Sequence, residues 1–397
     1  MNFSKITIDH KLQQKIREHG FTEMTKIQEK CIPEILKGKD VVGQAETGSG
    51  KTIAFSLPVL HKIKPKQGIQ TLVLTPTREL CIQVTTVLQD FGDDLGITIT
   101  PIFGGVNIEP QKKKIPSSDV IVSTPGRLLD HIKRKNINLK DISFLILDET
   151  DKMLEMGFIE DVEKIISYLP KKRQTLMFSA TISDDVYHIA KRHLRNPRIM
   201  KTRSLVDTTQ LKQKYYDIHN QSDKFSLLVH LLKHATPGLA IVFCATRKET
   251  DLIAKNLRKQ GIHASEIHGG MKQNKRLKSL DRLKNQEIDV LVATDVAARG
   301  LDIKNVTHVY NYDVPSTSKD YIHRIGRTAR AGENGDAITL LTKRDHDNFR
   351  RVQSDETLRI RRAQFPKFER VSIIRKQTQR RKNTFRYNSR RPPFHKR

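Results

Sequence analysis

The sequence predicts an α/β fold of two tandem domains, each a parallel sheet flanked by helices, followed by a basic tail. Three observations support this prediction. The 397 residues are enough for two domains of ordinary size. Short apolar runs alternate with amphipathic stretches through residues 1–206, a rhythm typical of a parallel sheet covered by helices, and it restarts in the second half. The polar segment Thr202 to Gln210 separates the halves and is predicted to be a linker.

Short apolar runs give the predicted strands. In the first half they are Asp40 to Val42, Thr71 to Leu74, Val120 to Val122, Phe144 to Leu147 and Thr175 to Phe178. In the second half they are Ala240 to Phe243, Val290 to Val292, Val306 to Tyr310 and Ala337 to Leu341. No strand is expected beyond about His346. The predicted domains are residues 1–206 and 207–345, with an extension over 346–370 and a tail over 371–397.

The charge of the chain points to a polyanion. The tail, Val371 to Arg397, holds ten Lys/Arg residues and no acidic residue, so it is expected to be disordered in isolation. The whole chain has 72 Lys+Arg against 44 Asp+Glu, a net charge of +28. This balance favours a nucleic-acid partner, and a basic chain that is merely soluble is the alternative.

The cysteines and the apolar runs predict the compartment. Cys31, Cys81 and Cys244 have neither metal-site spacing nor a disulfide framework, so they are predicted to be reduced, packed thiols. No apolar run approaches the ~18 residues of a membrane span. The N-terminus lacks the apolar core of a secretory signal. We therefore expect a cytoplasmic protein with no membrane partner.

A glycine-rich stretch between an apolar run and a helix-like run predicts a nucleoside triphosphate site. Glycine and small residues let a loop curl so that its N–H groups converge on phosphate oxygens, and the following helix adds its dipole. Lys51 can reach the β- and γ-phosphates, and the Thr52 hydroxyl can bind Mg²⁺. A chance glycine-rich turn is the alternative. The predicted nucleotide-binding residues are Ala45, in place of the usual first glycine, Glu46, Thr47, Gly48, Ser49, Gly50, Lys51 and Thr52.

Two carboxylates follow the predicted strand Phe144 to Leu147. Ligands of parallel sheets bind at the carboxyl ends of the strands, so these carboxylates are candidate catalytic groups. Asp148 is expected to hold Mg²⁺ through its water shell, and Glu149 to orient and activate the attacking water. The alternative is a solvated acidic turn.

Nine short motifs follow one another along the chain. They are AETGSGKT, PTREL (Pro76 to Leu80), Gly104-Gly105, TPGR (Thr124 to Arg127), DETD, SAT (Ser179 to Thr181), VFCATR (Val242 to Arg247), ATDVAARGLD (Ala293 to Asp302) and HRIGRTAR (His323 to Arg330). Their order resembles that of DEAD-box RNA helicases. The resemblance covers roughly residues 3–345 and implies two RecA-like domains joined by a linker. Thr150 replaces the alanine for which the family is named, giving a DETD variant.

The segment before the glycine-rich stretch is similar to the adenine-reading motif of this family. The Gln28 amide offers a donor and an acceptor that match adenine, and Phe21 would stack on the base. Phe3 is similar to an upstream aromatic residue that supports this loop. Met24 and Lys26 stand where the family usually has prolines. The alternative is that Phe21 and Gln28 are ordinary helix-entry residues.

The resemblance implies that Asp151, Ser179 and Thr181 couple hydrolysis to RNA release. In the second half, Arg324, Arg327 and Arg330 are spaced three apart and share a face on a helix.

Opposed to the glycine-rich stretch, Arg327 and Arg330 would act as arginine fingers, and a solvated basic helix face is the alternative. The resemblance also implies a coupling role for His323 and Arg324 and a ribose contact for Asp295.

RNA contacts are expected from backbone amides and small side chains, which bind phosphate and 2′-hydroxyl and make recognition largely independent of sequence. The stretch His268-Gly269-Gly270 departs from the family pattern, which has an aspartate third. The implied RNA-binding residues are Arg78, Gly104, Gly105, Thr124, Arg127, Gly269, Gln273, Arg276 and Thr294.

Together these features predict an ATP-dependent RNA helicase that uses ATP and Mg²⁺ to unwind short RNA duplexes locally and to remodel RNA or RNA–protein complexes. The alternative is an ATP-gated RNA clamp or annealing factor with little productive unwinding. A DNA helicase of related fold is a weaker option. Ribonucleoprotein particles or ribosomal precursors are candidate partners.

Overall fold

The computed structural model describes most of the chain: residues 1–46, 48–202, 211–236, 238–298, 303, 306–328 and 335–374, with the backbone alone at positions 273, 274, 284 and 296. Thr47, Arg330, the predicted linker from residue 203 and the tail beyond Ile374 therefore lie outside the described residues, as does the side chain of Gln273.

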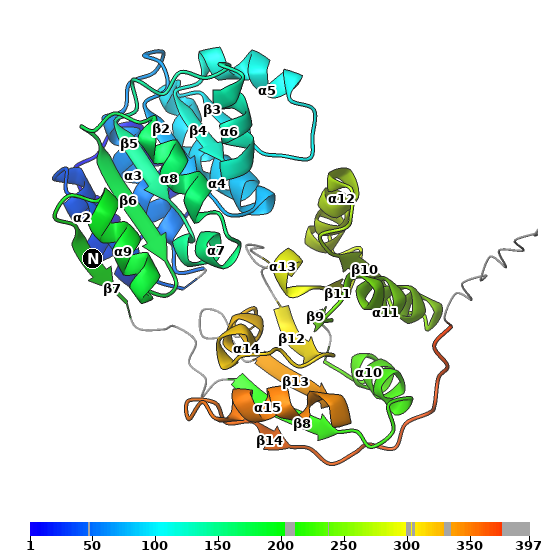
Figure 1. Ribbon diagram of the computed structural model, residues 1–397. Helices are drawn as coiled ribbons and strands as arrows, with labels where there is room; N and C mark the ends of the chain where they lie inside the picture. Colours follow the sequence, from blue (N-terminus) through cyan, green and yellow to red (C-terminus); the bar gives the residue numbers. More distant parts are fainter. Residues whose placement is uncertain are drawn as a thin grey trace, which may run out of the picture.

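The first domain contains a parallel sheet of seven strands in the order β3-β4-β2-β5-β6-β1-β7 (Figure 1). Its strands are β1 (Val41–Gln44), β2 (Thr71–Leu74), β3 (Ile99–Ile102), β4 (Val120–Ser123), β5 (Phe144–Leu147), β6 (Gln174–Ser179) and β7 (Arg198–Lys201). Its α-helices are α1 (His10–Glu18), α2 (Lys26–Leu36), α3 (Lys51–Lys62), α4 (Arg78–Gly92), α5 (Glu109–Lys114), α6 (Pro125–Lys133), α7 (Thr150–Glu155), α8 (Ile159–Ser167) and α9 (Asp184–His193), with 3₁₀ turns at Phe3–Lys5, Asp93–Leu95 and Ile115–Ser117.

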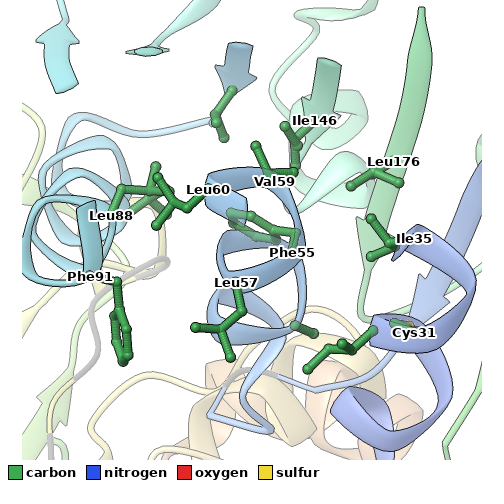
Figure 2. Packing of buried hydrophobic residues seen from close by; sticks show 14 of the residues in the cluster. Cys31, Ile35, Phe55, Leu57, Val59, Leu60, Leu88, Phe91, Ile146 and Leu176 are labelled. Carbon is green, nitrogen blue, oxygen red and sulfur yellow. The ribbon is translucent and has the colours of Figure 1, made fainter. Parts of the chain in front are cut away.

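Helices cover both faces of this sheet, because successive strand residues point to opposite sides. Ile146 of β5 packs with Phe55 of α3 and Leu88 of α4 on one face (Figure 2). Leu145 and Leu147 of the same strand belong to the other core, with residues of α6, α8 and α9. The near-continuous apolar run that predicted this strand is thus explained by burial on both faces.

The second domain repeats the arrangement with a sheet in the order β10-β11-β9-β12-β13-β8-β14, again with parallel pairs (Figure 1). Its strands are β8 (Leu211–Asp217), β9 (Leu239–Phe243), β10 (Ala264–Ile267), β11 (Val290–Ala293), β12 (Val306–Asn311), β13 (Gly335–Leu341) and β14 (Arg361–Arg362). Its α-helices are α10 (Asp223–Lys233), α11 (Arg247–Lys259), α12 (Gln273–Lys284), α13 (Asp295–Ala298), α14 (Ser318–Ile325) and α15 (His346–Gln353), with a 3₁₀ turn at Lys343–Asp345.

The prediction of two tandem parallel α/β domains is confirmed, and every predicted strand is present within a residue or two at its ends. The expectation that no strand follows about His346 is wrong, because β14 pairs with β8 through Arg361 and Arg362. Both arginines are exposed, so backbone pairing rather than apolar burial forms this strand.

The predicted tail boundary at Val371 is also wrong. The Val371 N–H donates to Ser226 Oγ at 3.0 Å, and the Ile374 N–H donates to Asn256 Oδ1 at 2.9 Å. Val371 and Ile373 pack against the core of the second domain. Residues 371–374 therefore belong to the second domain, because their backbone and apolar side chains both find partners there.

Candidate active site and RNA groove

The glycine-rich loop connects the carboxyl end of β1 to α3. Gly48 and Gly50 adopt left-handed backbone conformations with φ of 86° and 90°, which glycine reaches without strain. The Ala45 N–H donates to the Ser179 carbonyl at 3.0 Å and so ties the loop to the end of β6. Lys51 is the first residue of α3, and its buried Nζ donates to the carbonyls of Ala45 at 2.6 Å and Glu46 at 2.8 Å. The lysine is therefore held at the mouth of a loop of anion-binding type.

The two predicted catalytic carboxylates are buried next to this lysine. Glu149 has a positive φ of 52° and is the N-cap residue of α7; it directly follows Asp148, whose carboxylate accepts from the Glu149 N–H at 3.0 Å. Burial and the neighbouring Glu149 raise the pKa of Asp148 to about 7, against the opposing charge of Lys51. Burial also lowers the pKa of Lys51, which the two carboxylates oppose.

The environment of Glu149 favours its ionised form. Burial opposes ionisation, but Lys152 and Lys51 outweigh it, and Arg327 of the second domain adds to their effect, so the pKa of Glu149 is lowered. Lys152 Nζ lies 3.1 Å from Glu149 Oε2, and both side chains are 5% exposed. The neighbouring carboxyl groups thus differ in proton affinity, the pattern expected where two carboxylates have different roles.

The residues expected to couple hydrolysis to RNA release form one hydrogen-bonded network. Asp151 Oδ2 accepts from the N–H and the hydroxyl of Thr181 at 3.0 and 3.1 Å. The Ser179 hydroxyl accepts from the Asp151 N–H at 3.2 Å and donates to the Thr181 carbonyl at 2.7 Å. Thr150 is fully buried, and its hydroxyl lies 3.4 Å from the carbonyls of Leu147 and Phe178. The threonine therefore fits where the resemblance led us to expect alanine.

The predicted adenine-reading residues lie beside the loop. Gln28 Oε1 accepts from the Thr25 N–H at 2.9 Å, and its Nε2 donates to the Gly50 carbonyl at 3.2 Å. A glutamine amide has two donors and an oxygen with two lone pairs, so one of each is left for a base. Phe21 is 41% exposed and contacts the buried ring of Phe3 with a centroid separation of 6.5 Å. Phe3, which the resemblance implies supports this loop, thus lies against Phe21.

In the second domain, the structure joins two residues to which the sequence gave separate roles. Arg324 donates from Nε and Nη2 to the two carboxylate oxygens of Asp295, at 2.6 and 2.7 Å. Arg324 also donates to Asn311 Oδ1 and stacks 5.0 Å from the Phe243 ring. The guanidinium thus fixes the Asp295 carboxylate at the start of α13. His323 precedes it on α14, and Arg327 follows and is buried.

The expected RNA-binding residues gather around a cavity of about 650 Å³ between the domains. In the first domain they follow β2, β3 and β4, and β2 lies next to β5, whose end carries the carboxylates. Gly105 and Thr294 do not line this cavity. The expected residues that line it are Arg78, Gly104, Thr124, Arg127, Gly269 and Arg276, joined by Glu79, Asp130, Lys133, Met156, Phe158 and Met271 among others.

Among the described residues, two ion pairs connect the domains, and sequence reasoning missed both. Arg276 Nε lies 2.9 Å from Glu79 Oε1, whose side chain is 2% exposed. Lys319 Nζ lies 2.7 Å from Glu155 Oε1. Glu79 stands inside the PTREL motif, so its position was a signal, but nothing in the sequence named its partner.

Sequence comparison supports the family resemblance across both domains. The sequence profile described as DEAD/DEAH box helicase matches residues 25–189, and the one described as helicase conserved C-terminal domain matches residues 223–332. The chain is 43% identical over 369 residues to the ATP-dependent RNA helicase CshA of Listeria monocytogenes, covering 92% of this chain and 71% of the relative. It is 47% identical over 343 residues to the DEAD-box ATP-dependent RNA helicase CshA of Streptococcus pneumoniae, covering 86% and 66%.

Solved structures agree with this comparison. S. cerevisiae Dbp5 bound to RNA and ADP BeF3 superposes with a TM-score of 0.83 at 33% identity, covering 91% of this chain and 95% of Dbp5. A DEAD box protein from Methanococcus jannaschii gives 0.54 at 37% identity, covering 92% and 99%. The two structures cover similar shares of this chain but differ in TM-score. The arrangement of the two domains here is therefore closer to that of the RNA-bound Dbp5. Throughout the described ranges, no helix combines the length and apolar character of a membrane span.

Proposed function

Because the chain belongs to the DEAD-box family of ATP-dependent RNA helicases, we propose that it hydrolyses ATP at the carboxyl ends of β1, β5 and β6, with arginine fingers supplied by the second domain. One observation carries this proposal. Lys51, Asp148 and Glu149 are buried together in the first domain, and Arg327 of the second domain lies close enough to lower the pKa of Glu149. A hydrolysis site shared between domains in this way works when the domains close.

Binding of the triphosphate would exchange the partners of Lys51. Its Nζ now donates to the carbonyls of Ala45 and Glu46, and phosphate oxygens carry more charge than these carbonyls. Asp148 and Thr52 would hold Mg²⁺, which neutralises charge on the phosphates when it is bound. The described residues contain no group of three potential His, Cys, Asp or Glu ligands, so nucleotide oxygens and water would complete the shell.

Glu149 would orient the attacking water and accept its proton, a role supported by the lowered pKa that keeps its carboxylate ionised. Arg327 and Arg330 would stabilise charge on the transferring phosphoryl group. The Asp151 carboxylate accepts hydrogen bonds from both the backbone N–H and the hydroxyl of Thr181. A shift of the segment from Asp148 to Asp151 on hydrolysis would therefore be transmitted to the residues that follow β6. We propose this route for coupling hydrolysis to RNA release.

The groove around Arg78, Thr124, Arg127 and Gly269 would hold RNA largely independently of sequence. Ribonucleoprotein particles or ribosomal precursors are the proposed targets. The cytoplasm is the proposed compartment, supported by three cysteines that are all free and buried, as in proteins of reducing compartments.

The test is ATP turnover with and without RNA, followed by separation of a short duplex. Lys51→Ala should abolish hydrolysis while leaving the fold intact, and Lys64→Ala, at an exposed lysine just beyond α3, is the matched control. Near-normal turnover by folded Lys51→Ala would contradict the site. RNA-stimulated turnover without strand separation would instead favour the ATP-gated clamp.

A further inference from the structure

Three neighbouring aromatic rings, those of Phe21, His19 and Phe91, connect the exposed part of the proposed adenine motif to the core of the first domain. His19 follows α1, and its imidazole lies 5.5 Å from the Phe21 ring with an interplanar angle of 17°. It also lies 5.3 Å from the Phe91 ring, at 28°. Phe91 belongs to the last turn of α4 and is buried in the core of the first domain. His19 is thus the middle ring between a fixed aromatic residue and the exposed Phe21.

The His19 ring is also held at its edge. Its Nε2 lies 2.7 Å from Asp90 Oδ2, directly before Phe91 on α4. Lys15 Nζ lies 3.9 Å from the carboxylates of both Asp90 and Asp94, so this acidic side is itself balanced by a cation. Two consecutive residues of one helix therefore set the plane and the rotation of the imidazole.

Phe21 is held at its backbone, where its N–H donates to the Ile16 carbonyl at 3.0 Å, but its ring has no polar atom that could fix its rotation. It follows Gly20, whose left-handed φ of 70° is a conformation that glycine enters and leaves easily. Its side chain is 41% exposed, and its contact with Phe3 is the longer one, at 6.5 Å. An exposed ring after a glycine loses conformational entropy when a base stacks on it, and a ring already held in place loses less.

We propose that His19 is a positioning residue for the nucleotide base: it stacks behind Phe21 and presents that ring to the adenine of ATP. This inference rests on the proposed adenine stacking by Phe21. We assign His19 no contact with the phosphates or the reacting atoms, so its expected effect is confined to binding of the base. Aromatic pairs contribute enough to change an affinity by about 2- to 10-fold.

The experiment measures the KM for ATP and kcat in His19→Ala, with inorganic triphosphate as a competitive inhibitor that has no base. The KM should rise about 2- to 10-fold, while kcat at saturating ATP and the inhibition constant of triphosphate stay unchanged. His19→Phe, which keeps a ring between Phe21 and Phe91, should recover most of the loss. His10→Ala, at the first residue of α1, whose side chain is 84% exposed, is the matched control.

Phe21→Ala separates this inference from the proposed function. A raised KM in Phe21→Ala with an unchanged KM in His19→Ala overturns the role of His19 and leaves the adenine site standing. An unchanged KM in both variants overturns the adenine role of Phe21 and the inference with it. Equal weakening of ATP and triphosphate in His19→Ala shows general damage to the loop, which also overturns the proposal.

Discussion

Glu149→Gln tests the chemistry of the site with the smallest change of shape. The wild-type carboxylate is buried, ionised and 3.1 Å from Lys152 Nζ. Glutamine keeps the volume and a carbonyl oxygen but cannot accept the proton of the attacking water. We expect the RNA-stimulated rate to fall by roughly 10²-fold or more, the range of a general base, which corresponds to at least about 2.7 kcal/mol of transition-state stabilisation. The variant should still close on RNA with ATP and release the RNA slowly.

The same substitution has a second, measurable cost. It leaves the Lys152 ammonium buried without its anion, and removal of one partner from a buried ion pair costs about 3 kcal/mol or more. In a domain of about 200 residues, that loss lowers the melting temperature by roughly 6–12 °C. Removing both partners is often close to neutral, so Glu149→Gln combined with Lys152→Met should regain much of the stability. The double variant should remain as inactive as the single one.

Single-turnover ATP hydrolysis, RNA release and thermal unfolding distinguish these effects. Glu163→Gln is the matched control, since Glu163 is an acidic residue of the same domain that lies on α8 and pairs with Arg192. Fast hydrolysis with normal RNA release in Glu149→Gln would refute the role of the carboxylate. Recovery of hydrolysis together with stability in the double variant would show that the single variant was inactive because it was unstable.

Three other outcomes are expected. Gly105→Ala adds a Cβ that points at the Arg78 guanidinium, from a backbone φ of 79°. Because this displaces the guanidinium, half-maximal stimulation of ATP turnover should need about tenfold more RNA, whereas an unchanged RNA dependence would refute the contact between Arg78 and RNA. Burial raises the pKa of Cys31 and Cys81 to about 12, so about one thiol in 10⁴ is ionised at pH 8, and alkylation before unfolding would contradict their burial. Ending the chain at Ile374 removes ten Lys/Arg residues; if half contact RNA, the salt slope should flatten by roughly 3, whereas superimposable binding curves would exclude tethering.

The nucleotide site could be predicted because its signals are local. The glycine-rich loop, Lys51 and the carboxylates each follow directly from an apolar strand, and parallel strands bring their carboxyl ends to one edge of the sheet. Positive φ at Gly48 and Gly50 is what a curled anion-binding loop needs from glycine. Residue type and spacing were therefore enough to predict the arrangement of this proposed site, without knowledge of distant contacts.

Several strands could not be predicted, because apolar burial is not what identifies them. β7 and β8, with the sequences RIMK and LKQKYYD, are rich in charged or polar residues. β7 lies at the edge of its sheet, and the two residues of β14 are exposed arginines. Edge strands need only backbone pairing, so polar residues are tolerated there and the apolar signal is lost. The segment 371–374 was assigned to the tail for another reason, since its partners Ser226 and Asn256 lie more than 100 residues away in the sequence.

Long-range charge pairing could not be predicted either, and it changes how the positive charge of the chain should be counted. The sequence assigned Arg276 to RNA and gave Glu79 no role, because the two stand nearly 200 residues apart. In the structure they form an ion pair at the wall of the groove, where a buried carboxylate needs a cation nearby. The charge of Arg276 is therefore partly offset by Glu79, so its contact with an RNA phosphate returns less free energy than the contact of an unpaired arginine would. The count of 72 Lys+Arg residues thus overstates the cations available to RNA inside the groove, since some of them are paired with carboxylates that composition alone cannot place.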